Sequence, residues 1–474
     1  MILDAYGKPI RTDRQRWLPV RASYDAAQTT TENQRHWANA DALSADAAAN
    51  ASTRAVLRKR ARYEVANNTY AKGIILTLAN DTVGTGPRLQ LLTDNAKLNR
   101  DVESAFAQWA HRISLAAKLR TMRMAKATDG EVFGLLMTNP GVENQVQLDL
   151  RLVEAECVRA PWEHLTYDPR MVDGVVLDEY DNPMQYYVTS EHPGDSHGWR
   201  LDYDTYQARS VIHWFRADRP GQHRGVCEIT AALPLFAQLR RYTLAVLMAA
   251  ETAADFAAVL YTDAPADGNA MPVDPLDTVE LERGMATTMP EGWRLGQIEA
   301  VQPTTTYKEF KGEVLNEIAR VLSIPYNIAA GNSSGYNYAS GRLDHQTYYK
   351  AIRVEQTDLG ETVLDPLLEQ WYYELSLLSD FAVLRNTVAP PHLWFWDGTE
   401  HVDPLKEANA QATRLESGTT TYAREYAKVG LDWEEEFEQR AREKKKSEEL
   451  GLTSPVALLA VPAVPDTGDD DDEK

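Results

Sequence analysis

Residues 331–335 read Gly-Asn-Ser-Ser-Gly and match the Gly-x-Ser-x-Gly pattern of a nucleophile elbow. In such an elbow a serine hydroxyl attacks an acyl carbon, with a histidine as its base and an acid that orients the histidine. Acids and histidines follow in a suitable order: Asp358, Asp365, His392 and His401. The elbow also needs a buried strand before the serine, whereas a helical pattern and Pro325 precede this one. The sequence therefore disfavours a serine hydrolase that uses Ser333, and we keep this function only as an alternative to a non-catalytic role.

Other catalytic chemistry lacks a pattern in this chain. The ten histidines show no His-Glu-x-x-His spacing, and no Gly-x-x-x-x-Gly-Lys-Ser/Thr loop is present. The segment Gly84-Thr85-Gly86 lacks the third glycine of a dinucleotide fingerprint. The two cysteines, Cys157 and Cys227, lie in unrelated contexts and indicate neither a disulfide framework nor a metal site. We expect no catalytic residue, no metal site and no cofactor.

The serine segment belongs to a longer uncharged stretch, residues 331–341, which ends at Arg342. Apolar residues at helical spacing precede it over 308–322 and follow it over 343–378, where Pro366 predicts a kink or restart. Three glycines make the backbone flexible, so we expect a loop that stays ordered here to have a function or a binding partner. The residues that we expect this loop to present are Asn332, Ser333, Ser334, Tyr336, Asn337, Tyr338 and Arg342.

Composition limits the possible partners. The chain has 474 residues and a formal net charge of −21, which disfavours a tight, general nucleic-acid binder. The acidity either keeps a soluble protein in solution, which is the favoured interpretation, or lines a path along which nucleic acid must slide. The longest apolar stretch, residues 242–261, contains Glu251 and Asp255 and is too polar to span a bilayer. With no apolar signal segment at the N-terminus, we expect a protein that is made and used, or assembled, inside a cell.

Helical patterns dominate the element order, so the predicted fold class is α+β and mainly helical. Helices are expected over 31–80, 95–110, 228–260 and 401–450, and strands over 132–137, 146–153, 175–177, 185–189, 211–215 and 381–384. The predicted helix over 228–260 is rich in alanine, which allows close approach of neighbouring helices. The basic run Arg54, Arg58, Lys59, Arg60 and Arg62 is either a solvated face or a contact to an acidic partner or DNA.

Several short motifs follow one another over about residues 50–445: Asn67-Asn68-Thr69-Tyr70-Ala71, Val83-Gly84-Thr85-Gly86-Pro87, Asp129-Gly130-Glu131-Val132-Phe133, Gly221-Gln222-His223-Arg224-Gly225, Ile324-Pro325-Tyr326 with Tyr336-Asn337-Tyr338, and Asp403-Pro404-Leu405 with Gly430-Leu431-Asp432. Taken in this order, they resemble the lambda-type family of tailed-phage portal proteins. Cys227 and Ala339 stand where the family usually has serine. Residues before 50 and the acidic C-terminal residues lack a clear counterpart.

The resemblance implies a portal fold in a homo-oligomeric, dodecameric ring at one capsid vertex, and no enzymatic activity. Double-stranded DNA would pass through its channel during packaging and ejection. The implied partners are the terminase large subunit, a head-completion or adaptor protein and the major capsid protein, with assembly in the host cytoplasm and no membrane. Another head–tail adaptor or minor capsid protein is the remaining structural alternative, and the length of the chain disfavours it.

Carried onto this sequence, the resemblance divides the chain as follows: 1–70 N-terminal arm and helices, 71–225 wing, 226–260 first stem helix, 261–305 clip, 306–325 second stem helix, 326–342 tunnel loop, 343–400 wing helix and return strand, 401–450 crown and 451–474 acidic tail. Tyr336 and Tyr338 would touch DNA without reading bases, or would pack on neighbouring subunits. The stem residues expected at the subunit interface are Ala249, Ala250, Ala253, Ala254 and Ala257.

Overall fold

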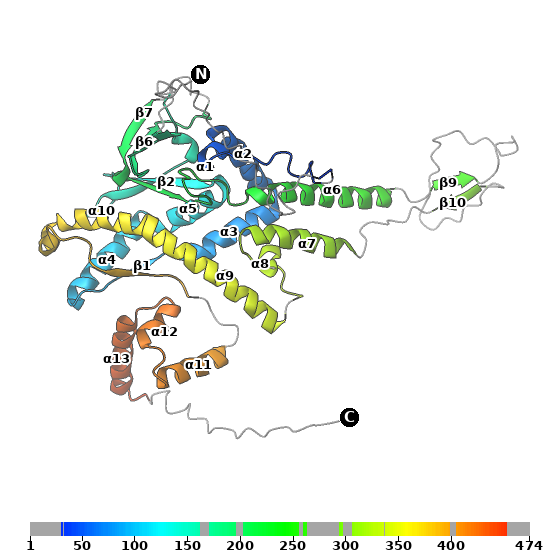
Figure 1. Cartoon of the computed structure of the whole chain (residues 1–474). Helices are drawn as coiled ribbons and strands as arrows, with labels where there is room; N and C mark the ends of the chain where they lie inside the picture. The colour runs from blue at the N-terminus through cyan, green and yellow to red at the C-terminus, as the bar shows by residue number, and fades with distance from the viewer. Residues whose placement is uncertain are drawn as a thin grey trace, which may run out of the picture.

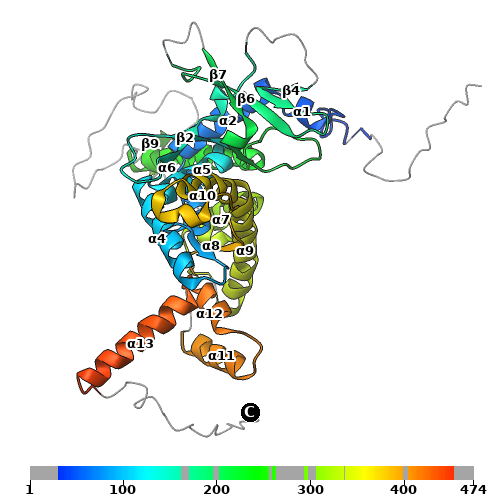
Figure 2. The same cartoon turned by 90° about the vertical axis from the view of Figure 1, so that its left-hand side faces the viewer.

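The computed structural model describes residues 30–31, 33–161, 170–195, 202–255, 259–262, 293–296, 306–335, 337–398 and 404–452. Within these ranges the chain forms a mixed body of helices and small antiparallel sheets, from which a pair of helices projects (Figure 1). A helical group formed by the C-terminal part lies at one end of the molecule (Figure 2). The predicted class, α+β and mainly helical, is confirmed.

Three capped helices open the described chain. They are α1 (Ala45–Ala48), α2 (Ala51–Asn67) and α3 (Thr69–Val83). The side chain of Asn50 accepts a hydrogen bond from the Thr53 amide, and Asn68 accepts from the amides of Tyr70 and Ala71. Asparagine satisfies the free amides of a first helical turn, so Asn68 both ends α2 and begins α3.

A three-stranded antiparallel sheet lies at the centre of the body, in the order β3-β2-β8. Its strands are β2 (Glu131–Thr138), β3 (Leu148–Val153) and β8 (Val211–Phe215). Glu131 lies opposite Phe215, and Phe133 lies opposite His213. A second sheet contains β4 (Met171–Val172), β5 (Val175–Leu177), β6 (Pro183–Thr189) and β7 (Tyr203–Gln207) in sequence order. The five strands predicted between 132 and 215 are all present.

The main core lies between this sheet and four helical segments. These are α4 (Ala96–Arg112), α5 (Leu115–Asp129), α9 (Tyr338–Leu359) and α10 (Asp365–Ser376), with one π-helical turn at Gly360–Leu364. Phe106, Trp109 and Trp371 contact one another at the centre, with ring centroids 5.1–5.9 Å apart. Pro366 lies in the first turn of α10, so the predicted restart is confirmed. Strand β1 (Arg88–Leu91) pairs with β11 (His392–Phe395) beside this core.

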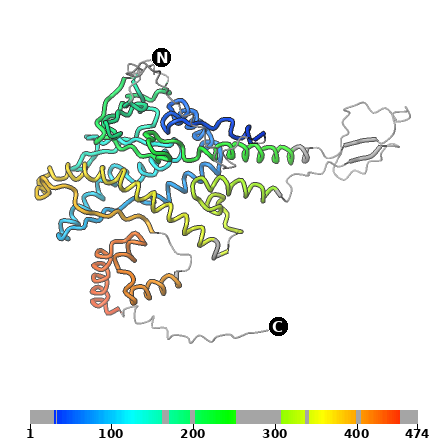
Figure 3. The backbone as a smooth tube through the Cα atoms, viewed as in Figure 1, coloured from blue at the N-terminus to red at the C-terminus, as the bar shows by residue number. Residues whose placement is uncertain are grey.

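The projecting pair consists of α6 (Leu233–Asp255) and α7 (Thr306–Val321), which lie side by side (Figure 3). A 3₁₀ turn at Thr230–Ala232 precedes α6, and the short helix α8 (Tyr326–Ala330) follows α7. Strands β9 (Val259–Thr262) and β10 (Trp293–Gly296) pair antiparallel. A second core joins α2, α3, α6, α7 and α9 through residues such as Ala61, Ile75, Phe236, Ile318 and Tyr348. Among the described residues, no helix combines the length and apolar character that crossing a bilayer requires.

Three helices form the C-terminal group: α11 (Pro404–Glu416), α12 (Tyr422–Lys428) and α13 (Trp433–Glu449). Two glycines bring it against the chain that follows β11. A Cβ on Gly430 would lie 2.5 Å from the carbonyl oxygen of Trp396, and one on Gly398 would lie 2.4 Å from Val429 Cα. Side chains at either position would therefore push the two segments apart.

Several predicted boundaries were wrong. The helix expected over 228–260 begins only at Leu233, and residues 259–260 belong to β9. The strand expected over 381–384 is a 3₁₀ segment, Ser379–Leu384, because Leu384 packs into the main core. The helix expected to run to Pro325 ends at Val321, where Ser323 adopts a positive φ of 56°. Helix α5 and strands β1, β4 and β7 were not predicted.

Candidate functional site

The uncharged segment follows a tightly closed helix end. Gly331 ends α8 with a φ of 62°, a conformation that glycine adopts without a steric cost. The amide of Asn332 donates to the carbonyl of Asn327 at 3.0 Å, and the amide of Ser334 donates to the Asn332 side chain at 2.9 Å. Residues 331–335 and Asn337 are exposed. The backbone is thus tied at its start while its side chains face solvent.

Asn327 connects this segment to the long helix α9. Its side-chain nitrogen lies 3.0 Å from Nε2 of His345 and 3.5 Å from the Ser333 hydroxyl. Asn327 is only 8% exposed, so its amide is held in place by its surroundings. Asn327 therefore joins the start of the loop and α9 in one set of polar contacts.

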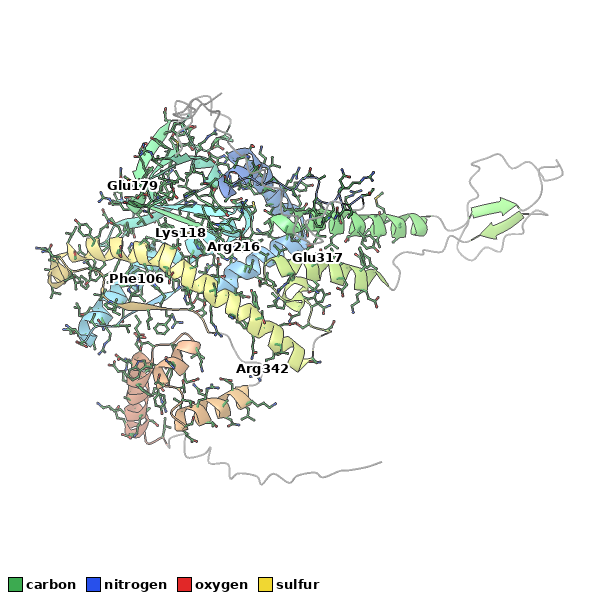
Figure 4. The ribbon with its side chains drawn as sticks, in the orientation of Figure 1. Phe106, Lys118, Glu179, Arg216, Glu317 and Arg342 are labelled. Carbon is green, nitrogen blue, oxygen red and sulfur yellow. The ribbon has the colours of Figure 1, made fainter. Side chains whose placement is uncertain are left out.

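The exposed loop is shorter than the sequence predicted. The segment expected as a loop, 326–342, is helical at both ends, because α8 occupies Tyr326–Ala330 and α9 begins at Tyr338. Tyr338 and Arg342 therefore lie on a helix, and the loop comprises residues 331–337. The carbonyl of Asn337 accepts from the Gly341 amide at 3.0 Å, as an N-cap residue does. Asparagine at 337 was the signal that could have placed this helix start. Arg342 is exposed, and it lies at the end of α9 far from α10 (Figure 4). Tyr336, and the side chain of Tyr338, lie outside the described residues.

The geometry contradicts the elbow interpretation of Ser333. The serine follows a helix rather than a strand, and no helix begins directly after it. Of the proposed partners, His392 lies 3.2 Å from Asp365, but both lie beyond the opposite end of α9. A helix of 22 residues is about 33 Å long. Asp358 accepts from Lys126 and Trp214 instead, and His401 lies outside the described residues.

Helix α9 is anchored to the body by a buried cation. Lys126 of α5 is 1% exposed, and its Nζ lies 2.8 Å from both Glu355 Oε1 and Asp358 Oδ2. The same ammonium lies 4.3 Å from the ring of Trp214, whose Nε1 donates to Asp358 at 2.7 Å. Burial opposes the charge of Asp358, but Lys126 and Trp214 hold the pKa of that carboxyl below its usual value.

A second set of contacts extends this anchor. Arg123, one helical turn before Lys126, donates to Glu228 at 2.9 Å, and both are buried. Tyr348 of α9 donates to Asp81 of α3 at 2.7 Å, and burial raises the pKa of its hydroxyl. The orientation of α9, and of the loop before it, is therefore fixed by the body.

The basic run of α2 fits neither of its two predicted roles in full. Arg54 and Arg58 are buried, and they pair with Asp173 and Glu131 respectively. Arg62 donates to both carboxylate oxygens of Asp129, at 2.6 and 2.9 Å. A charged residue can be buried when opposite charges and hydrogen bonds compensate it, which composition alone does not reveal. Lys59 and Arg60 remain exposed.

Two of the motifs meet at the centre of this ion network. Glu131 is fully buried and accepts from Arg224 Nε at 2.8 Å and Nη2 at 2.7 Å. The other N–H groups of Arg224 donate to the carbonyls of Ala155, Val158 and Asp173. Every nitrogen of the guanidinium therefore donates hydrogen bonds. Burial alone would raise the pKa of Glu131, but Arg224 and His213 hold it well below its usual value.

The glycines of the same motifs allow this contact. A Cβ on Gly225 would lie 2.1 Å from the carbonyl oxygen of Gly130. Gly130 has a φ of 92°, and a Cβ there would lie 2.5 Å from the carbonyl carbon of Val226. The two segments therefore meet backbone against backbone, which brings Glu131 within reach of the Gly225 amide at 2.9 Å.

Comparison with known proteins identifies the family to which these motifs belong. Residues 31–356 match the family described as "Phage portal protein, lambda family". The chain belongs to this family.

Curated relatives of the portal family cover nearly the whole chain. The chain is 26% identical over 453 residues to the probable portal protein of Halomonas phage phiHAP-1, and the match covers 88% of this chain and 86% of that protein. It is 22% identical to the portal protein of Escherichia phage N15, covering 84% and 85%. Among solved structures, a chain from the neck of a native gene transfer agent particle, computed with C12 symmetry, is 14% identical with a TM-score of 0.45, over 81% of this chain and 94% of that one.

Among the described residues of this portal family member, one group could offer three metal ligands within 4.8 Å of one another: Glu154, Glu156 and His192. The guanidinium of Arg62 lies 3.0 Å from Glu154 and 2.9 Å from Glu156. A cation of the protein therefore already pairs with both carboxylates, and we assign no metal site to them.

The predicted stem alanines lie on more than one face of α6. Ala249 is exposed, whereas Ala250 is half-buried and follows buried Leu239 and Val246 at intervals that place all three on the same helix face. Tyr242 contacts Tyr307 and Phe310 of α7, with ring centroids 5.7 and 5.0 Å apart. The side chains of Ala253 and Ala254, and all of Ala257, lie outside the described residues.

Proposed function

We propose that this portal protein assembles into a homo-oligomeric ring, dodecameric in the virion, at one vertex of the phage head. The ring conducts double-stranded DNA during packaging and ejection. It also docks the terminase large subunit, a head-completion or adaptor protein and the major capsid protein. The match of residues 31–356 to the lambda portal family carries this proposal.

The elements take roles in this ring. Helices α6 and α7 form the stem, and the residues between them, 261–305, form the clip. Residues 71–225, together with 343–400, form the wing, and α11–α13 form the crown. In support, α6 and α7 project from the body as an adjacent pair, as two stem helices must (Figure 1).

The loop at 331–337 and the start of α9 face the channel in this proposal. An uncharged loop forms no ion pairs with the phosphates. DNA therefore meets no deep energy minimum as it slides past the loop. Asn332, Ser333, Ser334 and Asn337 offer hydrogen bonds to sugars and phosphates without base readout. Arg342 supplies a single cation per subunit at the start of α9. The anchoring of α9 by Lys126 supports a loop that keeps its position while DNA moves.

The proposal gives the protein no catalytic residue, cofactor or metal, and places it at the capsid vertex after assembly in the host cytoplasm. A serine-reactive phosphonate tests the catalytic part. We expect no stoichiometric labelling. Labelling that is lost in Ser333→Ala would overturn it.

Electron microscopy of the purified protein, paired with its solution mass, tests the ring. We expect rings with a central hole and a mass many times the 53.2 kDa of one chain. A single-chain mass, both alone and after co-expression with the phage's major capsid protein, would contradict the proposal. For the channel, Tyr336→Ala with Tyr338→Ala should leave rings intact and impair DNA packaging or retention. Normal packaging in that variant would exclude these tyrosines from the channel role.

A further inference from the structure

Helix α6 exposes one face with the spacing of a helix–helix seam. Ala237, Arg241, Leu244, Met248 and Glu251 recur at alternating intervals of four and three residues, and all five are exposed. Leu244 is 50% exposed, and Leu247 beside it is 53% exposed. Large apolar side chains at seam positions indicate that another helix covers this face.

The body end of the same face is an apolar groove bordered by positive charge. The groove, of about 510 Å³, lies between α2 and α6 and is lined by residues that include Leu57, Tyr63, Leu233, Pro234 and Ala237. Lys59 and Arg60 of α2 also line it and are exposed. Among the described residues, Lys59, Arg60 and Arg241 form no ion pair. This side of the stem thus presents unpaired cations.

Helix α7 exposes a face of opposite charge. Glu309, Glu313, Asn316 and Arg320 follow the same four-and-three spacing, Glu317 lies beside them, and all are exposed. Within the described part of the chain, Glu309, Glu313 and Glu317 have no cationic partner. Phe310, 53% exposed, borders this acidic face.

We propose that, in the ring, the α6 face of one subunit packs against the α7 face of the next. Arg241 then lies opposite Glu309, and Arg60, with Lys59, lies opposite Glu313. The occupant of the α2–α6 groove and seam is thus a second copy of this chain. Two different faces meet, as a ring of identical subunits requires. The inference rests on the proposed ring and adds the surfaces that close it.

The contacts within one chain set the register. Tyr242 of α6 lies level with Tyr307 and Phe310 of α7, and the two helices run in opposite directions. In a ring whose axis runs along these helices, the rotation that relates neighbouring subunits leaves each residue at the same height along the axis. The neighbour's Glu309 therefore comes level with Arg241, and its Glu313 comes one turn nearer the body, where Arg60 borders the groove. Phe310 comes level with the space between Ala237 and Leu244.

Reciprocal charge reversal tests the pairing. One variant carries Arg60→Glu with Arg241→Glu, a second carries Glu309→Lys with Glu313→Lys, and a third carries all four changes. The control, Lys444→Glu with Lys445→Glu on α13, shifts the net charge as the first variant does, at exposed positions away from both faces. Ring fraction is measured by mass photometry, and the folding of each variant is checked by circular dichroism.

We expect each face variant alone to lower the ring fraction about tenfold or more, because like charges placed opposite each other at an interface cost several kcal/mol. The fourfold variant should recover rings, and the control should match the unmodified protein. Normal rings from either face variant would overturn the inference while leaving the ring itself intact. Loss of rings in both without recovery in the fourfold variant would overturn the pairing. Failure of the unmodified protein to form rings, both alone and after co-expression with the major capsid protein, would instead count against the proposed function.

Discussion

Glu131 and Arg224 form a bidentate ion pair, at 2.7 and 2.8 Å, between two motifs that lie 93 residues apart. Both side chains are buried, and Arg58, His213 and the Gly225 amide also donate to the same carboxylate. The pair joins the start of β2 to the chain that leads into α6. The projecting helix is therefore attached to the body through a fully hydrogen-bonded charge cluster.

Replacing Arg224 by lysine should destabilise the fold by at least about 3 kcal/mol, because several buried hydrogen bonds are lost and each buried group left unsatisfied costs about 1–3 kcal/mol. Lysine keeps the charge, but it cannot form the bidentate pair and reach three carbonyls together. The midpoint of urea unfolding measures the effect. As a control, Arg100→Lys alters the pair with Glu438, in which both side chains are about half exposed, and should cost at most about 1 kcal/mol. Equal effects of the two substitutions would contradict a special role for Arg224.

Stability should fall in two steps as the pH is lowered. Burial lowers the pKa of His213 from 6.5, so below pH 6.5 the unfolded chain binds a proton that the folded chain does not, and stability declines. The pKa of Glu131 is held well below 4.5, so its contribution is present above that value and is lost as the pH falls through the folded pKa. Unfolding free energies between pH 3 and pH 8 record both steps.

His213→Gln should remove the step that begins at pH 6.5, whereas His111→Gln, a change at an exposed histidine, should retain it. Because His213 also stacks between Phe133 and Phe215, the variant will be less stable at every pH. The informative quantity is therefore the slope of stability against pH and not its absolute value. An unchanged slope in His213→Gln would assign the step to another group.

A methyl group at position 225 should be tolerated poorly. The added Cβ of Gly225→Ala would lie 2.1 Å from the Gly130 carbonyl oxygen, so the backbones must separate and the Glu131 contacts must lengthen. We expect a loss of more than about 3 kcal/mol, at the upper end of the range for single substitutions. In contrast, Gly73→Ala in α3 places its Cβ in open space and should stabilise the helix by about 0.5–1 kcal/mol. Thermal unfolding of the two variants should shift in opposite directions.

The sequence singled out the residues of the ion network but did not indicate which of them pair. Gly130, Glu131, Arg224 and Gly225 stood out as motif residues, yet nothing in either segment indicates that the two pack together. The basic run of α2 shows the same limit, because burial of Arg54 and Arg58 depends on acids that lie far away in the sequence, Asp173 and Glu131. Helical periodicity was sufficient for α4, α7 and α10, whose apolar stripes face the two cores.

Local patterns failed where tertiary pairing decides the structure. The segment Phe381–Leu384 is β-prone, but β1 pairs with residues 392–395 instead, and the segment winds into a 3₁₀ turn. The stem alanines suggested a single interface, yet the structure exposes Ala249 and turns Ala250 toward the face of Leu239 and Val246. Alanine content alone does not say which side of a helix meets a partner.

Removal of the buried cation Lys126 should loosen α9 and the loop before it. Lys126→Met leaves Asp358 without its ammonium partner and Glu355 with only Arg123. We expect amide exchange in α9 to accelerate at least about tenfold, which corresponds to about 1.4 kcal/mol. Hydrogen exchange followed by mass spectrometry resolves α9 from the body. Lys118→Met, which removes a partly exposed pair from the same helix α5, is the control and should leave α9 protected.

Enlarging Ala250 should disturb the stem from within one subunit. Because Ala250 is half-buried on the face of Leu239 and Val246, Ala250→Leu should overpack this face of α6 and cost about 1–3 kcal/mol. The strained stem should also lower the yield of rings. Ala249→Leu is the matched comparison, because Ala249 is exposed and the change should leave unfolding of the single chain unaltered. A reduced ring yield from Ala249→Leu would place that residue at a subunit contact, whereas an unchanged yield would exclude it. Rings from Ala250→Leu that are as stable as those of the unmodified protein would show that this face of α6 has room for a larger side chain.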